Sequence, residues 1–212
     1  MKYNFIAIEG NIGAGKTSLA TRIANDFNAK LILEEFEDNA FLPKFYKEPE
    51  KYAFPLEMTF LASRYQQLKD QLGQQDLFKN FTISDYYIVK SLIFAKKTLP
   101  SDEFNLYTKF FNIIFQQLPK PDLLVYLYLK TPNLQRNIHK RGRPYELAIE
   151  DEYLERIQTG YFEFFKQQDS VLRVLIIDTN NLDFVNNDDD YSKMVEIIGR
   201  DYENGIHRII PD

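Results

Sequence analysis

The residues with the clearest chemistry stand near the start of the chain, in the run Gly10-Asn11-Ile12-Gly13-Ala14-Gly15-Lys16-Thr17. The run matches G-x-x-x-x-G-K-[ST] at every fixed position and lies between an apolar segment and an amphipathic one. In such a P-loop the glycines let backbone N–H groups face a phosphate, Lys16 neutralises charge between the β- and γ-phosphates, and Thr17 offers its hydroxyl to Mg²⁺. The sequence therefore predicts that the chain binds a nucleoside triphosphate together with Mg²⁺.

Carboxylates at the ends of two apolar segments are the next candidates. Asp85 follows Phe81-Thr82-Ile83-Ser84, and an Asp at the carboxyl end of a strand is a usual second metal-ordering group in P-loop enzymes. Glu34 and Glu35 follow the second apolar segment, at the edge where open α/β proteins bind ligands. One of these two is the candidate general base for a phosphoryl acceptor, although either could be ordinary solvated charge.

A short basic segment stands out in an acidic chain, with the cations Arg136, His139, Lys140, Arg141 and Arg143. Thr131-Pro132 predicts the start of a helix with Thr131 as its N-cap, and Gly142 predicts release into a loop. Two guanidinium groups on either side of a flexible glycine suit an anion-binding role. The alternative is that these basic residues form an ordinary solvated face of the helix.

Apolar, β-rich segments recur along the chain, each followed by polar or helical sequence. They are Tyr3–Ile8, Leu31–Leu33, Phe81–Ser84, Leu123–Leu129 and Leu172–Ile177. The pattern predicts an α/β fold with a five-stranded parallel sheet flanked by helices. A long insertion with helical spacing separates the second and third segments, and we expect it to build the substrate pocket. Near the end, 180–183 and 186–190 are predicted as exposed loop and 192–202 as the last helix.

The composition limits the class of protein. The chain has 212 residues, of which 44% are hydrophobic and 15% aromatic, enough for one α/β domain and too many for disorder. It has no cysteine, so disulfides and thiolate metal sites are excluded. A net charge of −5 offers no surface for a nucleic-acid polymer, and no segment resembles a membrane span or signal peptide. We expect a single domain over residues 1–212, without a membrane partner, in the cytoplasm.

Taken together in chain order, these motifs resemble those of the deoxyribonucleoside kinase family, most closely its bacterial deoxyguanosine and deoxyadenosine kinases. The residues that carry the resemblance are Ile6-Ala7-Ile8-Glu9-Gly10 before the P-loop, Glu34 before Glu37-Asp38-Asn39, Tyr46 ahead of Glu57, Arg64, Asp85 through Ile93-Phe94-Ala95, and Arg141-Gly142-Arg143 with Glu146. The resemblance implies a P-loop kinase fold with a lid at about residues 137–150 and a homodimer. It implies transfer of the γ-phosphate of ATP, or another triphosphate, to a deoxyribonucleoside 5′-OH.

The resemblance also assigns roles to single residues. Glu34, rather than Glu35, looks like the base that takes the 5′-hydroxyl proton, and Lys16 and Arg141 look like catalytic cations. Tyr46 and Glu146 resemble the pair that binds the sugar 3′-OH, and Phe94 resembles the aromatic that stacks on the base. Further expected contacts are those of Arg141 and Arg143 with the donor phosphates, of Asp183 and Phe184 with the donor base, of Thr17 and Asp85 with Mg²⁺, and of Glu57, Arg64 and Asp85 with the substrate.

Three positions depart from the family pattern. The arginine usually found after the strand-terminal acid is replaced in Asp85-Tyr86-Tyr87, so another cation must stand beside the base. Asn137 stands where the family has a lid arginine. Arg136 is one position earlier, where its side chain is rotated by about 100° around the helix. A base-reading Asp corresponds to Ser91.

Glu57 stands where many relatives have a glutamine that reads the base, and this change predicts a purine preference. An ionised carboxylate only accepts hydrogen bonds, which suits the N1–H and N2–H donors of guanine, whereas adenine offers one donor beside an acceptor. We therefore expect deoxyguanosine to be favoured, with Arg64 neutralising Glu57. The alternatives are a deoxyadenosine-preferring or broad kinase and a thymidylate-like monophosphate kinase. A GTPase switch would need an Asn-Lys-x-Asp motif, which the sequence lacks.

Overall fold

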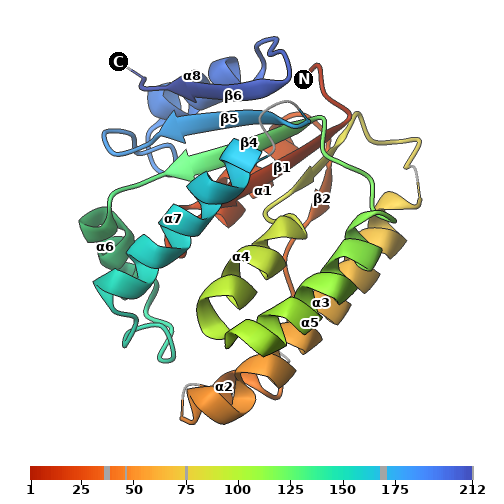
Figure 1. Ribbon diagram of the computed structural model, residues 1–212. Coiled ribbons are helices and arrows are strands. Elements are labelled where there is room, and N and C mark those ends of the chain that lie inside the picture. Colours follow the sequence, from red (N-terminus) through yellow and green to blue (C-terminus); the bar gives the residue numbers. More distant parts are fainter. Residues whose placement is uncertain (36–38, 46, 75, 168–170, 212) are drawn as a thin grey trace. The chain divides into compact units, whose positions relative to one another are not determined.

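The computed structural model describes residues 1–35, 39–45, 47–74, 76–167 and 171–211. They form two compact units (Figure 1). The sheet unit comprises Met1–Leu33, Asp76–Tyr87 and Lys120–Asp212, and the helical unit comprises Glu34–Gln75 and Ile88–Pro119. Each unit is described on its own below. The expectation of one domain over the whole chain stays a prediction.

The sheet unit is built on a parallel sheet with the strand order β2-β3-β1-β4-β5-β6. The strands are β1 (Phe5–Gly10), β2 (Lys30–Ile32), β3 (Thr82–Ser84), β4 (Leu123–Tyr128), β5 (Arg173–Asp178) and β6 (Gly205–Ile209). β1 is buried at all six positions, because both faces of the sheet are covered and an alternating pattern is not needed. β1 pairs with β3 on one side and β4 on the other, so the chain reverses its direction of travel across the sheet at β1. Ligands bind at such a point in open α/β sheets.

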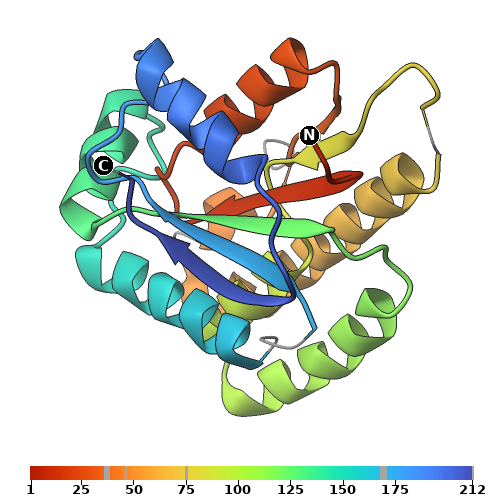
Figure 2. The same ribbon diagram turned by 90° about the horizontal axis from the view of Figure 1, so that it is seen from above.

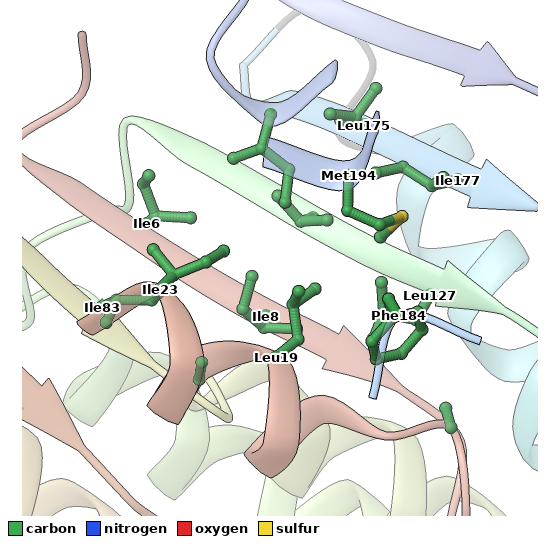
Figure 3. Close-up of a cluster of buried hydrophobic side chains, with 14 of the residues drawn as sticks. Ile6, Ile8, Leu19, Ile23, Ile83, Leu127, Leu175, Ile177, Phe184 and Met194 are labelled. Carbon is green, nitrogen blue, oxygen red and sulfur yellow. The ribbon is translucent and has the colours of Figure 1, made fainter. Parts of the chain in front are cut away.

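Helices cover both faces of this sheet (Figure 2). One face packs on α1 (Lys16–Asp26) and α8 (Asp188–Ile198), where Ile6, Ile8, Leu19 and Met194 belong to a single buried cluster (Figure 3). On the other face, Tyr126 of β4 packs against aromatic side chains of α7 (Asp151–Gln167), with its ring centroid 4.9 Å from that of Tyr161. α6 (Thr131–Arg141) also belongs to this unit.

The helical unit contains α2 (Leu42–Phe45), α3 (Pro49–Leu72), α4 (Val89–Thr98) and α5 (Ser101–Phe115). α3, α4 and α5 pack on one another. α3 is the predicted insertion helix, and its buried face includes Glu57 and Arg64 among the apolar residues Leu56, Leu61 and Leu68. Burying two charged side chains on one helix face is costly unless they have partners. We refer to Glu57, Arg64 and the polar residues around them as the polar centre of this unit.

The structure corrects the predicted number of strands. Within the described ranges the sheet has six strands, because β6 adds to the edge of β5 with Ile206 opposite Val174. β6 is only partly buried and carries His207 and Arg208, so it lacks the continuous apolar run that marks the inner strands.

Two helix starts also differ from the prediction. α8 begins at Asp188, inside the segment predicted as loop, because the side chain of Asn187 accepts hydrogen bonds from the N–H groups of Asp189 and Asp190. It ends at Ile198 rather than near Tyr202. Thr131 is the first residue of α6 and Lys130 is its N-cap, one position from the prediction. None of the helices in the described ranges is long and apolar enough to cross a membrane.

Candidate active site

The P-loop joins β1 to α1 in a conformation that depends on glycine. Gly13 and Gly15 have φ values of 83° and 86°, which side-chain-bearing residues rarely adopt. A Cβ atom on Gly13 would lie 2.8 Å from the carbonyl oxygen of Leu134, and one on Gly15 would lie 2.8 Å from the ring of Phe184. The loop leads directly into the first turn of α1, and the N–H groups at a helix N-terminus are suited to binding an anion.

Side chains fix the P-loop from several directions. The amine of Lys16 donates to the carbonyl oxygens of Gly10 and Asn11 at 3.0 and 2.9 Å. The amide of Asn11 is buried and donates to the carbonyl oxygen of Leu154 at 2.7 Å. Asn137 of α6 donates to the carbonyl oxygen of Gly13 at 2.8 Å. Asn137, which was noted in the sequence only as a departure, is therefore a structural contact of the loop.

Thr17 and Asp85 come together from different elements. The hydroxyl of Thr17, in the first turn of α1, donates to Oδ2 of Asp85 at 2.5 Å, directly after β3. The described residues contain no cluster of three or more His, Cys, Asp or Glu side chains that could hold a metal. A hydroxyl beside a carboxylate nevertheless suits Mg²⁺, which prefers oxygen ligands and usually keeps substrate phosphates and waters in its shell.

The predicted lid residues contact one another. α6 ends at Arg141, and Gly142 caps it with φ 70° and donates its N–H to Ile138, as the sequence predicted. Glu146, whose side chain is buried, forms ion pairs with Arg141 and, at 3.4 Å, with Arg143. The acid expected at the sugar and the two arginines expected at the donor phosphates thus form one cluster within the sheet unit.

Asp183 and Phe184 are adjacent in the chain but have different environments. Phe184 is buried in the core beneath the P-loop, where its ring faces Gly15 (Figure 3). Asp183 is exposed, and its carboxylate accepts from the side chain of Asn186 at 3.0 Å, which lowers its pKa from the usual value. The carbonyl oxygen of Phe184 accepts from Arg22 at 3.3 Å, so backbone groups of this segment do face polar partners.

The polar centre of the helical unit is built around Glu34. Its Oε1 accepts from Nε of Arg64 at 2.8 Å, and its Oε2 accepts from the amine of Lys90 at 2.6 Å. Burial by itself raises the pKa of Glu34, but the charges of Lys90 and Arg64 outweigh it and hold this pKa well below its usual range. Glu34 is therefore an ionised carboxylate clamped between two cations. Its neighbour Glu35 is exposed and accepts only from Gln67 among the contacts described.

Glu57 lies in the same unit but has a different environment. Its side chain is buried, and its Oε1 accepts from the hydroxyl of Thr98 at 2.9 Å. Burial raises the pKa of Glu57 from 4.5 to about 7, although Arg64, Thr98 and Lys90 each lower it in part. Glu57 therefore exchanges its proton near neutral pH, whereas the sequence argument treated it as fully ionised.

Arg64 was expected to neutralise Glu57, and its charge lowers the pKa of Glu57 in part, but its hydrogen bonds go to other residues. Its Nε and Nη2 contact Glu34, and its Nη1 donates to Ser91 at 2.7 Å. Position 64 is seven positions beyond 57, a rise of about 10 Å along a helix, and the carboxylate that Arg64 contacts is that of Glu34. Ser91, which replaces the expected Asp, serves here as the neutral acceptor of this arginine.

Lys90 and Thr98 are the site residues that the sequence reasoning missed. Both lie on α4 at intervals of four from Phe94, so the three side chains share one face of the helix. The amine of Lys90 lies 5.4 Å from the ring centroid of Phe94, which is half-buried. Counting in fours from Phe94 would have found both residues, and Lys90 places a cation beside Glu34, the predicted base. Tyr46 lies outside the described residues, as do Glu37 and Asp38.

Comparisons with known proteins agree with these features. A model of the deoxynucleoside kinase family matches residues 6–202. The chain belongs to this family. It is 42% identical over 193 residues to the deoxyguanosine kinase of Bacillus subtilis (strain 168), covering 90% of this chain and 93% of that protein. It is 32% identical to the deoxyadenosine kinase of Dictyostelium discoideum, covering 94% of this chain and 79% of that protein.

Solved structures of deoxynucleoside kinases share the fold. The deoxyadenosine kinase of M. mycoides with bound dCTP has a TM-score of 0.77 and 27% identity, covering 92% of this chain and 98% of that one. The same kinase with bound dATP has a TM-score of 0.78 and 27% identity, covering 92% and 100%. The predicted P-loop kinase fold and family are confirmed, with the sixth strand as the correction.

Proposed function

We propose that the protein transfers the γ-phosphate of ATP, or of another nucleoside triphosphate, to the 5′-OH of a purine deoxyribonucleoside, with deoxyguanosine favoured. The observation that carries this proposal is the match to the deoxynucleoside kinase family over residues 6–202, and the similarity to a bacterial deoxyguanosine kinase supports the purine. The product is the nucleoside 5′-monophosphate. The O5′–P bond forms as the bond from the γ-phosphorus to its bridging oxygen breaks, and the nucleoside diphosphate leaves.

The donor triphosphate binds to the sheet unit in this proposal. The P-loop, residues 10–17, surrounds the phosphates with backbone N–H groups, and Lys16 turns from its loop carbonyls to the β- and γ-phosphates. Arg141 and Arg143 leave Glu146 and stabilise charge on the transferring group. Asp183 and Phe184 border the donor base, which they contact mainly through backbone groups.

Mg²⁺ is proposed to bind at Thr17 and Asp85. When bound, the ion neutralises charge on the β- and γ-phosphate oxygens. The hydroxyl of Thr17 and the carboxylate of Asp85 supply oxygen ligands, and Asp85 in turn accepts the hydrogen bond that orients Thr17. Its position directly after β3 supports this role.

The acceptor nucleoside binds to residues of the helical unit in this proposal, and Glu146 of the sheet unit keeps its predicted role at the sugar. Glu34 takes the proton of the 5′-OH, and Arg64 and Lys90 fix its orientation. Glu57 reads the base edge, and Arg64 is a further predicted contact of the substrate. Phe94 stacks on the base, and Tyr46 and Glu146 bind the 3′-OH. The strongly depressed pKa makes Glu34 a weak base. Its main contribution is therefore to hold a proton acceptor in a fixed position beside the 5′-OH while the O5′–P bond forms.

A second copy of the chain is the proposed partner. α5 leaves the large side chains Leu106, Phe110 and Ile113 between 44% and 58% exposed at intervals of four and three, which places them on one helix face. Light scattering after size-exclusion chromatography tests this expectation. A mass of two chains supports the homodimer, and a mass of one chain contradicts it.

The activity is tested by incubating the protein with Mg-ATP and a panel of acceptors, identifying products by mass. The panel contains deoxyguanosine, deoxyadenosine, deoxycytidine, thymidine, guanosine and dTMP. We expect deoxyguanosine to lead and dTMP to be inert, because both cations of the helical unit's polar centre already contact Glu34. Phosphorylation of dTMP alone would overturn the proposal in favour of a monophosphate kinase.

A further inference from the structure

Glu57 combines deep burial with the lack of a direct cation partner. Its side chain is 4% exposed, and within the described part of the chain no lysine, arginine or histidine forms an ion pair with it. A buried carboxylate without such a partner is costly, so its neutral form becomes accessible. Glu57 can therefore be either ionised or neutral in the folded protein.

The charged and titratable groups around Glu57 come from three helices. Arg64 on α3 and Lys90 on α4 attract the ionised form, but their hydrogen bonds go to Glu34 and Ser91. Tyr107 on α5 interacts electrostatically with Glu57 and stays protonated, because burial raises its pKa. These neighbours lower the pKa of Glu57 only partly, leaving it near 7.

Thr98 allows Glu57 to change charge without leaving a buried polar group unpaired. Its hydroxyl oxygen lies 2.9 Å from Oε1 of Glu57 and 3.1 Å from the carbonyl oxygen of Phe94. A hydroxyl has one hydrogen and two lone pairs. When Glu57 is ionised, Thr98 donates to its carboxylate. When the proton lies on Oε1 of Glu57, Thr98 accepts it and donates to Phe94 instead. Both charge states are therefore satisfied.

The two charge states of Glu57 match different purines. The carboxylate presents two acceptors, which pair with the N1–H and N2–H donors of guanine. The neutral carboxyl pairs with adenine when its proton lies on Oε2. The O–H then donates to N1, and Oε1 accepts from the N6 amine while keeping the hydrogen bond from Thr98, much as a glutamine amide would. A mismatch leaves a buried polar group unpaired, which discriminates strongly between substrates.

We propose that Glu57 and Thr98 form a proton-controlled purine selector, in which the ionised pair selects deoxyguanosine and the neutral pair selects deoxyadenosine. This inference rests on the proposed function and names what determines its substrate. Thr98 acts through Glu57 and is a positioning residue. The preference for deoxyguanosine therefore rises with pH, and both purines are substrates near the crossover.

The test measures kcat/KM for deoxyguanosine and deoxyadenosine with Mg-ATP between about pH 6 and pH 8.5. The ratio removes effects common to both substrates, such as titration of the donor phosphates. We expect the deoxyguanosine-to-deoxyadenosine ratio to rise at least about tenfold over this range, the size of effect expected for one mismatched buried hydrogen bond. In Glu57→Gln the ratio should favour deoxyadenosine and stay flat.

Thr98 provides a matched pair of variants. Thr98→Val removes the hydroxyl that donates to ionised Glu57, so the crossover should move to higher pH. Thr98→Ser keeps the hydroxyl and should retain the wild-type crossover. If Thr98→Val fails to fold, the comparison of wild type with Glu57→Gln still decides the proposal.

Proton exchange on binding gives a second readout that does not depend on turnover. Calorimetry near pH 7, in buffers of different ionisation enthalpy, should show protons released when deoxyguanosine binds and taken up when deoxyadenosine binds. A flat ratio in wild type, or binding of both purines without proton exchange, overturns the selector while leaving the kinase activity intact. Phosphorylation of neither purine overturns the proposed function itself and the selector with it.

Discussion

Glu34 and Glu57 are two glutamates of the same helical unit, one half-buried and one buried, with opposite electrostatic environments. Glu34 contacts the cations of Arg64 and Lys90, which hold its pKa well below the usual range. Glu57 has the hydroxyl of Thr98 as its hydrogen-bond partner, and burial raises its pKa to about 7. Burial acts on both carboxyls in the same direction, so the placement of neighbouring cations decides the outcome. Such a separation of pKa values lets two identical side chains take different roles.

The largest effect is expected from neutralising Glu34, the ionised glutamate of the two. Glu34→Gln should lower kcat for deoxyguanosine by about 10²–10⁴, because the 5′-OH loses its proton acceptor, while the nucleoside still binds. Steady-state kinetics and calorimetric binding measure the two effects. Glu34→Asp, which keeps the charge, guards against a folding defect and should retain more activity. Near-normal turnover in Glu34→Gln would place the base elsewhere.

Removing one cation from Glu34 makes its surroundings more like those of Glu57. Lys90→Gln should lower the free energy of unfolding by about 3 kcal/mol at pH 7, the cost of breaking a buried pair. The depressed pKa of Glu34 stabilises the fold above its unfolded value of 4.5, and this contribution is lost as the pH falls through the folded pKa. The loss caused by Lys90→Gln should therefore shrink in acid.

Urea denaturation at pH 7 and at about pH 2.5 checks this prediction, because the folded-state pKa of Glu34 lies well below its usual range. Lys96→Gln, on the exposed part of the same helix, is the matched control and should change little. An equal loss of stability at both pH values would show that Lys90 acts through packing rather than charge.

Glu57 should have the opposite effect on stability. Its folded pKa lies above the unfolded value of 4.5, so its contribution to stability is lost as the pH rises from about 4.5 to about 7. Glu57→Gln removes the buried charge and should raise the free energy of unfolding by about 1–2 kcal/mol at pH 8, with little effect at pH 5. Denaturant melts at the two pH values measure this. A variant less stable than wild type at pH 8 contradicts the environment assigned to Glu57.

The smallest effect is expected at the neighbour of Glu34. Glu35 is exposed, so Glu35→Gln should change the free energy of unfolding by less than about 0.5 kcal/mol and leave kcat nearly unchanged. The same kinetic and denaturation measurements apply. A large loss of kcat here would reverse the assignment of the two adjacent acids.

Local patterns in the sequence predicted the residues that are proposed for the donor side of the site. The P-loop depends on residues adjacent in the chain, and Asp85 was located by its position after an apolar segment, where the structure brings it to Thr17. The inner strands were recognised by continuous apolar runs. β6 was missed because an edge strand carries polar residues, and α8 was begun too late because its Asn and Asp residues are capping groups rather than loop.

The environment of the two glutamates depended on contacts that the sequence does not reveal. Arg64 was assigned to Glu57 from their shared helix, whereas its contacts are with Glu34, 30 residues earlier in the chain. In the sequence alone, Lys90 and Thr98 are ordinary polar residues of an apolar helix. The packing of α4 against α3 makes them partners of Glu34 and Glu57. Charge pairing across helices is therefore the part that required the structure.

The most direct test of the account is a carbon-13 NMR titration of the glutamate side-chain carboxyls, with Glu34 and Glu57 assigned through their Gln variants. The account predicts that the Glu57 resonance titrates near pH 7 and that the Glu34 resonance shows no titration down to about pH 4. Titration of Glu57 near 4.5, or of Glu34 near neutral pH, would contradict the opposite environments on which the account depends.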